Sequence, residues 1–214
     1  MESDPTNLSE REAGLDPVSR RAAFLDRDGV INIDHAYVYR REDFEFVPGV
    51  LAAARTLHEA GYALVVVTNQ SGIGRGMYSE ADFDRLTDWM RGEFAAAGAP
   101  IAGVYFCPHH PRDAQEPYRL DCDCRKPAPG MLLAAARDLK LDLASSVLFG
   151  DKESDLQAAA AAGVQERVLL GTNGQSRPTA AAELASACFS SLADAVASPW
   201  FAAVSRSATS ESKP

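Results

Sequence analysis

The sequence contains no long hydrophobic run, and no stretch approaches the roughly 20 consecutive apolar residues of a membrane-spanning helix. Residues 1–20 are acidic and polar and lack the apolar segment of a secretory signal peptide. Basic residues are in the minority, because 21 lysines and arginines accompany 30 aspartates and glutamates. Nucleic-acid-binding proteins normally present a basic face. We therefore expect a soluble cytoplasmic protein that has no membrane or nucleic-acid partner.

Cysteine is scarce, and the four cysteines are unevenly placed. Cys107, Cys122 and Cys124 lie close together, whereas Cys188 stands alone. In a reducing compartment a cluster of three cysteines is better explained by metal binding than by disulfide bonds. We expect Cys188 to be a small buried apolar residue within a helix.

Short apolar runs alternate along the chain with helical patterns. Runs typical of buried strands occur at 22–25, 62–68, 101–106, 146–149 and 167–170. Apolar residues at helical spacing lie between them, at 48–60, 79–97, 130–139 and 154–162. This order predicts an α/β fold built on a doubly wound parallel sheet.

The two ends of the chain lack such patterns. We expect a disordered extension at 1–20 and a disordered tail at 203–214. With 214 residues, 46% of them hydrophobic, the chain is suited to one sizeable core. The sequence therefore predicts a single domain at 21–202.

Acidic residues directly follow two of the predicted strands. Asp26 and Asp28 come after the first, and Asp151 comes after the fourth, with Asp155 a further candidate. Any one of them alone would be an ordinary turn or cap residue. Together they should meet at the carboxyl edge of the sheet, where carboxylates repel one another unless a cation lies between them. Oxygen ligands of this kind favour Mg²⁺ bound together with a substrate phosphate.

Two loops supply groups that suit a phosphate. Thr68-Asn69-Gln70-Ser71-Gly72 offers a hydroxyl and several backbone amides at the end of the second predicted strand. Arg125 and Lys126 place two cations just before a predicted helix. Lys126 is suited to neutralising a transferred phosphoryl group.

The segments DRDGV at 26–30, TN at 68–69, Lys126 and GDKESD at 150–155 resemble the four ordered motifs of the haloacid dehalogenase superfamily of phosphotransferases. Their order and spacing match across about 150 residues. The resemblance implies a Rossmann-like phosphatase fold and a phosphomonoester hydrolase.

The same resemblance implies the roles of the acidic residues and of the phosphate-binding groups. Asp26 would attack phosphorus and form an aspartyl-phosphate, while Asp28 would act as general acid and then as general base. Mg²⁺ would be held by Asp26, the backbone carbonyl of Asp28, and Asp151. Thr68 and Lys126 would complete the catalytic set.

A long loop at 107–124 carries the residues of a second metal site. Three thiolates and one imidazole, from Cys107, His109, Cys122 and Cys124, suit a tetrahedral structural Zn²⁺ site, with His110 as the alternative imidazole. Such a site has no open position for catalysis. The loop ends directly before Arg125 and Lys126, so fixing it would also fix these cations.

No insertion is large enough for a separate cap domain, and without a lid or an apolar helix face we expect a monomer. The zinc loop, DHAYV at 34–38 and VVVTNQSGIGRG at 65–76 are similar to the D,D-heptose 1,7-bisphosphate phosphatases. This resemblance implies removal of the 7-phosphate during synthesis of nucleotide-activated heptose for lipopolysaccharide. The candidate substrate-binding residues are Asn69, Arg75, Arg125 and Lys152.

Two alternatives remain open at this point. The histidinol-phosphatase group shares the zinc loop, so histidinol phosphate is the alternative substrate. A non-catalytic, zinc-stabilised binding module is the alternative from a different class, and it would leave the set of carboxylates without a chemical role.

Overall fold

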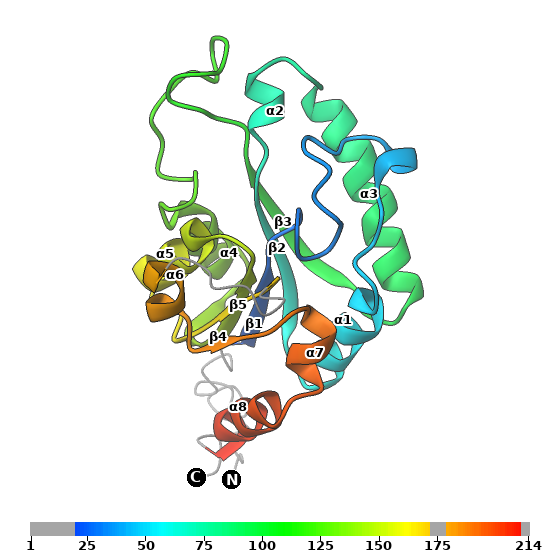
Figure 1. Ribbon diagram of the computed structural model, residues 1–214, viewed down its shortest axis with the longest axis vertical. Helices are drawn as coiled ribbons and strands as arrows, with labels where there is room; N and C mark the ends of the chain where they lie inside the picture. The colour runs from blue at the N-terminus through cyan, green and yellow to red at the C-terminus, as the bar shows by residue number, and fades with distance from the viewer. Residues whose placement is uncertain (1–19, 172–178, 211–214) are drawn as a thin grey trace, which may run out of the picture.

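The computed structural model describes residues 20–171 and 179–210 (Figure 1). Within them, six parallel strands form one sheet in the order β3-β2-β1-β4-β5-β6. The strands are β1 (Arg20–Leu25), β2 (Ala63–Asn69), β3 (Ile101–Cys107), β4 (Leu141–Gly150), β5 (Glu166–Leu169) and β6 (Ala187–Cys188). The order confirms the predicted doubly wound sheet.

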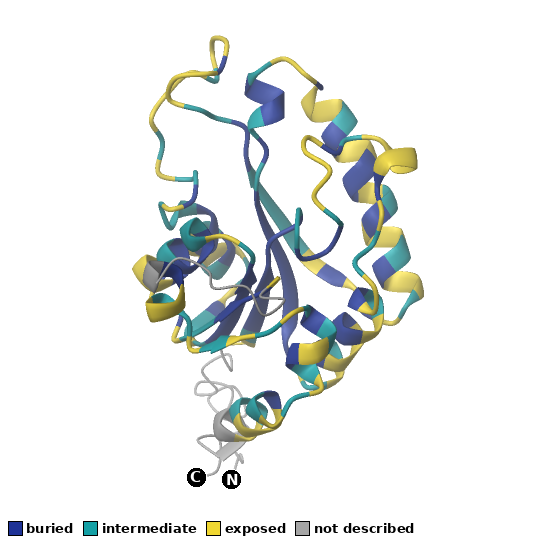
Figure 2. Cartoon of the chain, in the orientation of Figure 1, coloured by how far each residue is buried: buried dark blue, intermediate teal, exposed yellow. Residues whose placement is uncertain are grey.

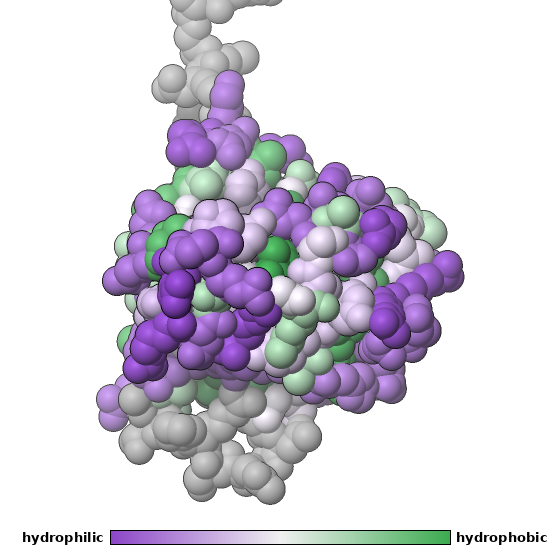
Figure 3. Space-filling model, turned by 90° about the horizontal axis from the view of Figure 1, so that it is seen from above, coloured by the Kyte–Doolittle hydropathy of each residue, from purple (hydrophilic) through white to green (hydrophobic). Residues whose placement is uncertain are grey.

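The strand order reverses direction between β1 and β4, which lie side by side at the centre. In doubly wound sheets the crevice at this reversal, beyond the carboxyl ends of the strands, is where ligands bind. β1 leads directly into Asp26, and β4 leads into Asp151. Seen from above, the side of the molecule on which these ends lie is largely hydrophilic (Figure 3).

Helices cover both faces of the sheet (Figure 1). One face carries α1, α3, α7 and α8, and the other carries α4, α5 and α6. The helices are α1 (Val50–Glu59), α2 (Ser71–Gly74), α3 (Glu80–Ala96), α4 (Gly130–Leu139), α5 (Glu153–Ala162), α6 (Thr179–Leu184), α7 (Leu192–Val196) and α8 (Pro199–Ser210), with a 3-10 turn at Arg41–Asp43. The helix α3 begins at a capping box in which Ser79 and Asp82 bond each other's backbone, which explains its predicted start.

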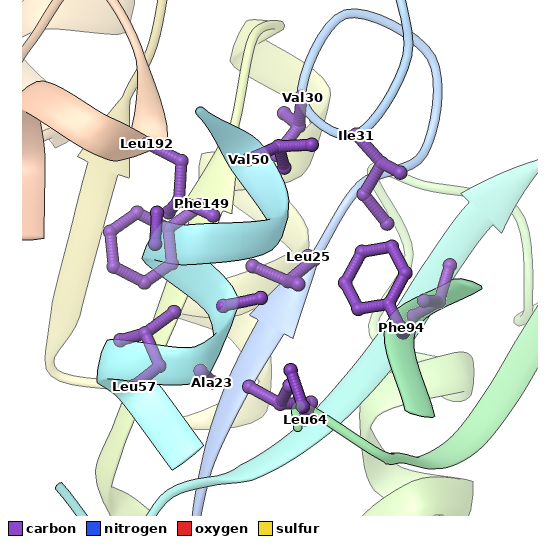
Figure 4. Close-up of a cluster of buried hydrophobic side chains, with 14 of the residues drawn as sticks. Ala23, Leu25, Val30, Ile31, Val50, Leu57, Leu64, Phe94, Phe149 and Leu192 are labelled. Atoms are coloured by element: carbon purple, nitrogen blue, oxygen red, sulfur yellow. The ribbon is translucent and has the colours of Figure 1, made fainter. Parts of the chain in front are cut away.

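The central strands β1 and β2 are buried on both sides (Figure 2). Because side chains alternate along a strand, Ala23 and Leu25 of β1 face one layer of helices while Ala22 and Phe24 face the other. In the first layer Leu25 lies among residues of α1, α3 and β4, including Phe149 (Figure 4). This two-sided burial explains why the strands read as continuous apolar runs.

The segments that link β1 to β2 and β2 to β3 form loops and helices, without a separate cap domain in the described chain, as predicted. None of the helices in that part of the chain combines the length and the apolar character needed to cross a membrane.

Two predictions were wrong. Residues 203–210 belong to α8 instead of a disordered tail, while 211–214 and the extension before Arg20 lie outside the described residues. The helix is held because Phe201 is buried near Tyr62 and because Arg21 donates a hydrogen bond to the carbonyl of Ser205. Cys188 is exposed on the short edge strand β6 and is not buried in a helix.

Candidate active site

Asp26 is the first residue after β1, and it is buried, with 5% of its surface exposed. Its backbone N–H donates to the carbonyl of Phe149 on β4, which fixes the residue at the centre of the sheet. One side-chain oxygen, Oδ1, lies 3.0 Å from Nζ of Lys126. Burial raises the pKa of Asp26, although Lys126 opposes the rise. The carboxylate is therefore desolvated and held in place by a cation.

Lys126 makes three contacts at the floor of the site. Its Nζ lies 3.0 Å from Asp26 and 2.7 Å from Oδ1 of Asp155, and it donates to the carbonyl of Val67 at 2.8 Å. Burial alone would lower the pKa of Lys126, but Asp155 and Asp26 together raise it. The lysine is thus a fixed positive charge beside Asp26.

Asp151 follows β4 and brings a third carboxylate to the same place. Carboxylate oxygens of Asp26, Asp151 and Asp155 lie within 4.8 Å of one another. Burial and the negative charge of Asp26 raise the pKa of Asp151 to about 7. Because Asp155 already pairs with Lys126 and accepts from the backbone of Lys152, Asp26 and Asp151 are the better placed pair for a cation. This hard oxygen donor set fits a divalent cation such as Mg²⁺.

The side chain of Asp28 accepts hydrogen bonds from three neighbouring side chains. Arg27 donates to both carboxylate oxygens at 2.9 Å, and Asn32 donates to Oδ1 at 3.0 Å. Gln70 donates to Oδ2 at 3.0 Å. Asp28 also lines an open cavity of about 230 Å³ together with Lys152. Its carboxylate is therefore fixed at the wall of the space in which a substrate would lie.

Thr68 and Asn69 end β2 next to this cavity. Thr68 is buried, and its Oγ1 accepts a hydrogen bond from Gln70. The side chain of Asn69 both donates to and accepts from the backbone of Lys126, each at 3.1 Å. Asn69 also lines the cavity, and its two hydrogen bonds position the loop that carries Lys126.

The three predicted substrate-binding cations differ in their surroundings. Lys152 lines the cavity and lies 3.2 Å from Asp34. Arg75 is directed to Asp113 at 3.0 Å and is not among the residues that line the cavity. Arg125 donates to the carbonyl of His109 at 3.1 Å. Only Lys152 therefore shares the cavity with Asp28 in this conformation.

The predicted cysteine cluster is assembled in the structure. The Sγ atoms of Cys107, Cys122 and Cys124 lie 3.2–3.6 Å apart, and Nδ1 of His109 lies 3.3 Å from Cys124. Burial raises the pKa of Cys107 and of Cys124. Four such donors suit tetrahedral coordination of Zn²⁺.

His110, the alternative imidazole, lies outside the cluster. Its Nδ1 accepts hydrogen bonds from the backbone N–H groups of Arg112 and Asp113. These bonds order the turn at 110–113, which lies within the 107–124 loop.

Nothing in the residue pattern singles out the three donors to Asp28, which are Arg27, Asn32 and Gln70, or Tyr78 beside Gln70. An arginine or a glutamine in a polar loop is normally solvated, but Arg27 and Gln70 are each only 2% exposed. Tyr78 donates to Gln70 at 2.6 Å. The one available signal is position, since Arg27 and Gln70 each adjoin a predicted site residue.

Comparison with known proteins agrees with this geometry. A family model described as HAD-hydrolase-like matches residues 123–195. The chain is 50% identical over 173 residues to the D-glycero-beta-D-manno-heptose-1,7-bisphosphate 7-phosphatase of Photorhabdus laumondii, covering 81% of this chain and 92% of that protein. It is 53% identical to a D-glycero-alpha-D-manno-heptose-1,7-bisphosphate 7-phosphatase of Burkholderia mallei, covering 77% and 87%.

Among solved structures, the chain is similar to the D,D-heptose 1,7-bisphosphate phosphatase of B. bronchiseptica complexed with magnesium and phosphate. The two are 32% identical with a TM-score of 0.69, over 90% of this chain and 99% of that one. The likeness confirms the predicted fold. The chain is thus a phosphatase of the haloacid dehalogenase-like hydrolases, and it belongs to the same family as these heptose bisphosphate 7-phosphatases.

Proposed function

We propose that the chain removes the 7-phosphate of D-glycero-D-manno-heptose 1,7-bisphosphate through an aspartyl-phosphate on Asp26. The observation that carries the proposal is the buried Asp26 carboxylate, held by Lys126 beside Asp151 where the strand order reverses. Identity of about 50% to phosphatases named for this substrate supports the choice of sugar.

In the proposed reaction an oxygen of Asp26 forms a bond to phosphorus while the bond from phosphorus to the sugar oxygen breaks. Asp28 gives a proton to the departing oxygen and later takes one from the water that hydrolyses the aspartyl-phosphate. Lys126 and the Thr68 hydroxyl stabilise charge on the phosphoryl group. A bound Mg²⁺, held by Asp26, Asp151 and the backbone carbonyl of Asp28, supplies positive charge that offsets repulsion between carboxylate and phosphate.

The cysteine cluster has a separate role in this proposal. Zn²⁺ bound by Cys107, His109, Cys122 and Cys124 would have four protein ligands and no position for water. We assign it a structural role, in which it orders the 107–124 loop and with it Arg125. The hydrogen bond from Arg125 to His109 supports this connection.

Lys152 and Asn69 line the cavity beside Asp28, and we propose that they contact the substrate. Arg75 and Arg125 are proposed to hold its sugar or its second phosphate. For Arg75 this requires the guanidinium to leave Asp113, an exposed partner whose ion pair with it is worth little in water.

The experiment that tests the proposal compares kcat/KM for heptose 1,7-bisphosphate with kcat/KM for histidinol phosphate, in the presence of Mg²⁺. Phosphorus NMR of the product identifies which phosphate is released. We expect a strong preference for the heptose and release from position 7. A preference for histidinol phosphate would show that the proposed substrate is wrong.

The variant Asp26→Asn tests the chemistry in the same assay. We expect turnover to fall by about 10³-fold or more, as for removal of a covalent nucleophile. Undiminished activity in this variant would refute the aspartyl-phosphate, and absence of any phosphatase activity in the unmodified protein would favour the non-catalytic binding module.

A further inference from the structure

Gln70 connects two of the residues that we place in the reaction. Its side-chain nitrogen, Nε2, donates to Oδ2 of Asp28 at 3.0 Å and to Oγ1 of Thr68 at 2.8 Å. Gln70 is only 2% exposed, so water cannot easily replace these bonds. A single buried amide therefore contacts both the proposed general acid and a proposed phosphate-binding hydroxyl.

The orientation of this amide is fixed from its other end. The hydroxyl of Tyr78 donates to Oε1 of Gln70 at 2.6 Å. Oδ2 of Asp28 accepts from Arg27 as well as from Gln70, and Oε1 of Gln70 accepts from Tyr78, so Nε2 faces Asp28 and Oε1 faces Tyr78. Burial raises the pKa of Tyr78 to about 12, so the hydroxyl keeps its proton at neutral pH.

We propose that Gln70 is a positioning residue that sets both the Asp28 carboxylate and the Thr68 hydroxyl, and that Tyr78 locks its amide in the required orientation. The inference rests on the proposed function, because it assigns Asp28 the role of proton donor. Gln70 and Tyr78 themselves take no part in bond making.

The contact with Thr68 has a specific chemical consequence. A hydroxyl has one proton to donate and two lone pairs to accept with. Because Thr68 accepts from Gln70, its own proton remains available for another acceptor. A phosphoryl oxygen at Asp26 is the acceptor that the proposed reaction supplies.

Tyr78 is itself held tightly in place. Its ring stacks on that of Tyr39, with centroids 5.0 Å apart and planes at 7°. The ring also packs closely against α2 at Gly72, where a Cβ atom would lie 2.2 Å from Cε1 of Tyr78. Glycine at position 72 is thus explained by the close approach of this ring.

The test uses the dependence of rate on the leaving group. Loss of proton donation slows the departure of an alkoxide far more than that of p-nitrophenolate, which needs no proton. The quantity measured is kcat/KM, since it reports formation of the aspartyl-phosphate and not its hydrolysis. We compare the heptose bisphosphate with p-nitrophenyl phosphate in the Mg²⁺-loaded enzyme.

We expect Gln70→Leu to lower kcat/KM for the sugar phosphate by about 100-fold, on the scale of general acid catalysis, and for the aryl phosphate by a much smaller factor. Tyr78→Phe removes only the hydroxyl. It should lower kcat/KM for the sugar phosphate by about five-fold, as for loss of one hydrogen bond. Gly72→Ala, which displaces the Tyr78 ring, should act in the same direction.

Tyr39→Phe is the matched control, because it removes a hydroxyl from the stacked ring and leaves the Tyr78 bond to Gln70 in place. The ratio of the two kcat/KM values in this variant should equal that of the unmodified enzyme. If Gln70→Leu and Tyr78→Phe remain folded and reduce the two kcat/KM values equally, Gln70 does not position Asp28 for proton donation. If they reduce neither value, the whole positioning role is wrong. The phosphatase assignment stands in both cases. Failure of the unmodified enzyme to hydrolyse either substrate would instead contradict the proposed function.

Discussion

Nζ of Lys126 lies 2.7 Å from Oδ1 of Asp155 and is closer to it than to Asp26, the proposed nucleophile. All three side chains are buried. Asp155 therefore shares the charge of the lysine, and this leaves Asp26 less strongly neutralised than it would be in a simple pair. The sequence pattern offered Asp155 as a further candidate for the metal edge, but these contacts give it the separate task of holding Lys126.

Replacing Asp155 should be costly for stability. In Asp155→Asn the buried lysine keeps Asp26 as its only anionic partner, and removal of one partner from a buried pair typically costs 3–5 kcal/mol. We expect the free energy of unfolding, measured with urea, to fall by about 3 kcal/mol. Asp138→Asn is the control, because its ion pair with Arg137 is exposed and should be worth under about 1 kcal/mol. Equal losses of unfolding free energy in the two variants would contradict the role of Asp155 in holding Lys126.

The pKa of Asp151 predicts a pH-dependent response to Mg²⁺. In the metal-free protein that pKa is raised from 3.8 to about 7, so this group favours the folded state at low pH and the advantage is lost as the pH rises through 7. A cation binds the ionised form and reverses the loss. Addition of Mg²⁺ should therefore raise Tm more at pH 8 than at pH 5.5. The same increase at both pH values, or an unchanged response in Asp151→Asn, would argue against Asp151 as a ligand.

The proposed zinc site predicts a loss of stability when one of its ligands is removed. Cys124→Ser should lower the zinc content of the purified protein to a fraction of one equivalent and reduce Tm, because metal binding contributes directly to folding. Cys188→Ser is the control, since that cysteine is exposed on β6 and lies outside the cluster. Elemental analysis and thermal unfolding measure both effects. Full stability of a zinc-free Cys124→Ser protein would contradict the structural role.

The sequence predicts the parts of the site that follow from strand order. Asp26, Thr68 and Asp151 lie at one edge of the sheet, because each comes at or directly after the carboxyl end of a parallel strand. The cysteine cluster is predictable for a similar reason, since its residues are rare and closely spaced.

The support around Asp28 could not be predicted, because it depends on packing between distant segments. Gln70 and Tyr78 meet only because α2 turns the chain back and because Gly72 admits the aromatic ring. The helix α8 was missed for another reason: its serines have weak helix propensity, and it is stabilised by the burial of Phe201 against the core.

Gly29 provides a test of the proposed Mg²⁺ site that removes none of its charged groups. Its φ is +94°, and a Cβ atom there would lie 2.5 Å from Oδ2 of Asp151. Gly29→Ala should therefore strain the loop and push Asp151 away from Asp26. We expect Mg²⁺ affinity, measured by calorimetry, to fall by about 10-fold to 100-fold, as when support of a metal ligand is lost.

Gly92→Ala is the control, because nothing lies within 4 Å of a Cβ at that position of α3. It should leave Mg²⁺ binding unchanged and stabilise the helix by about 0.5–1 kcal/mol. Unaltered Mg²⁺ affinity in a folded Gly29→Ala protein would show that the ion does not depend on the position of Asp151.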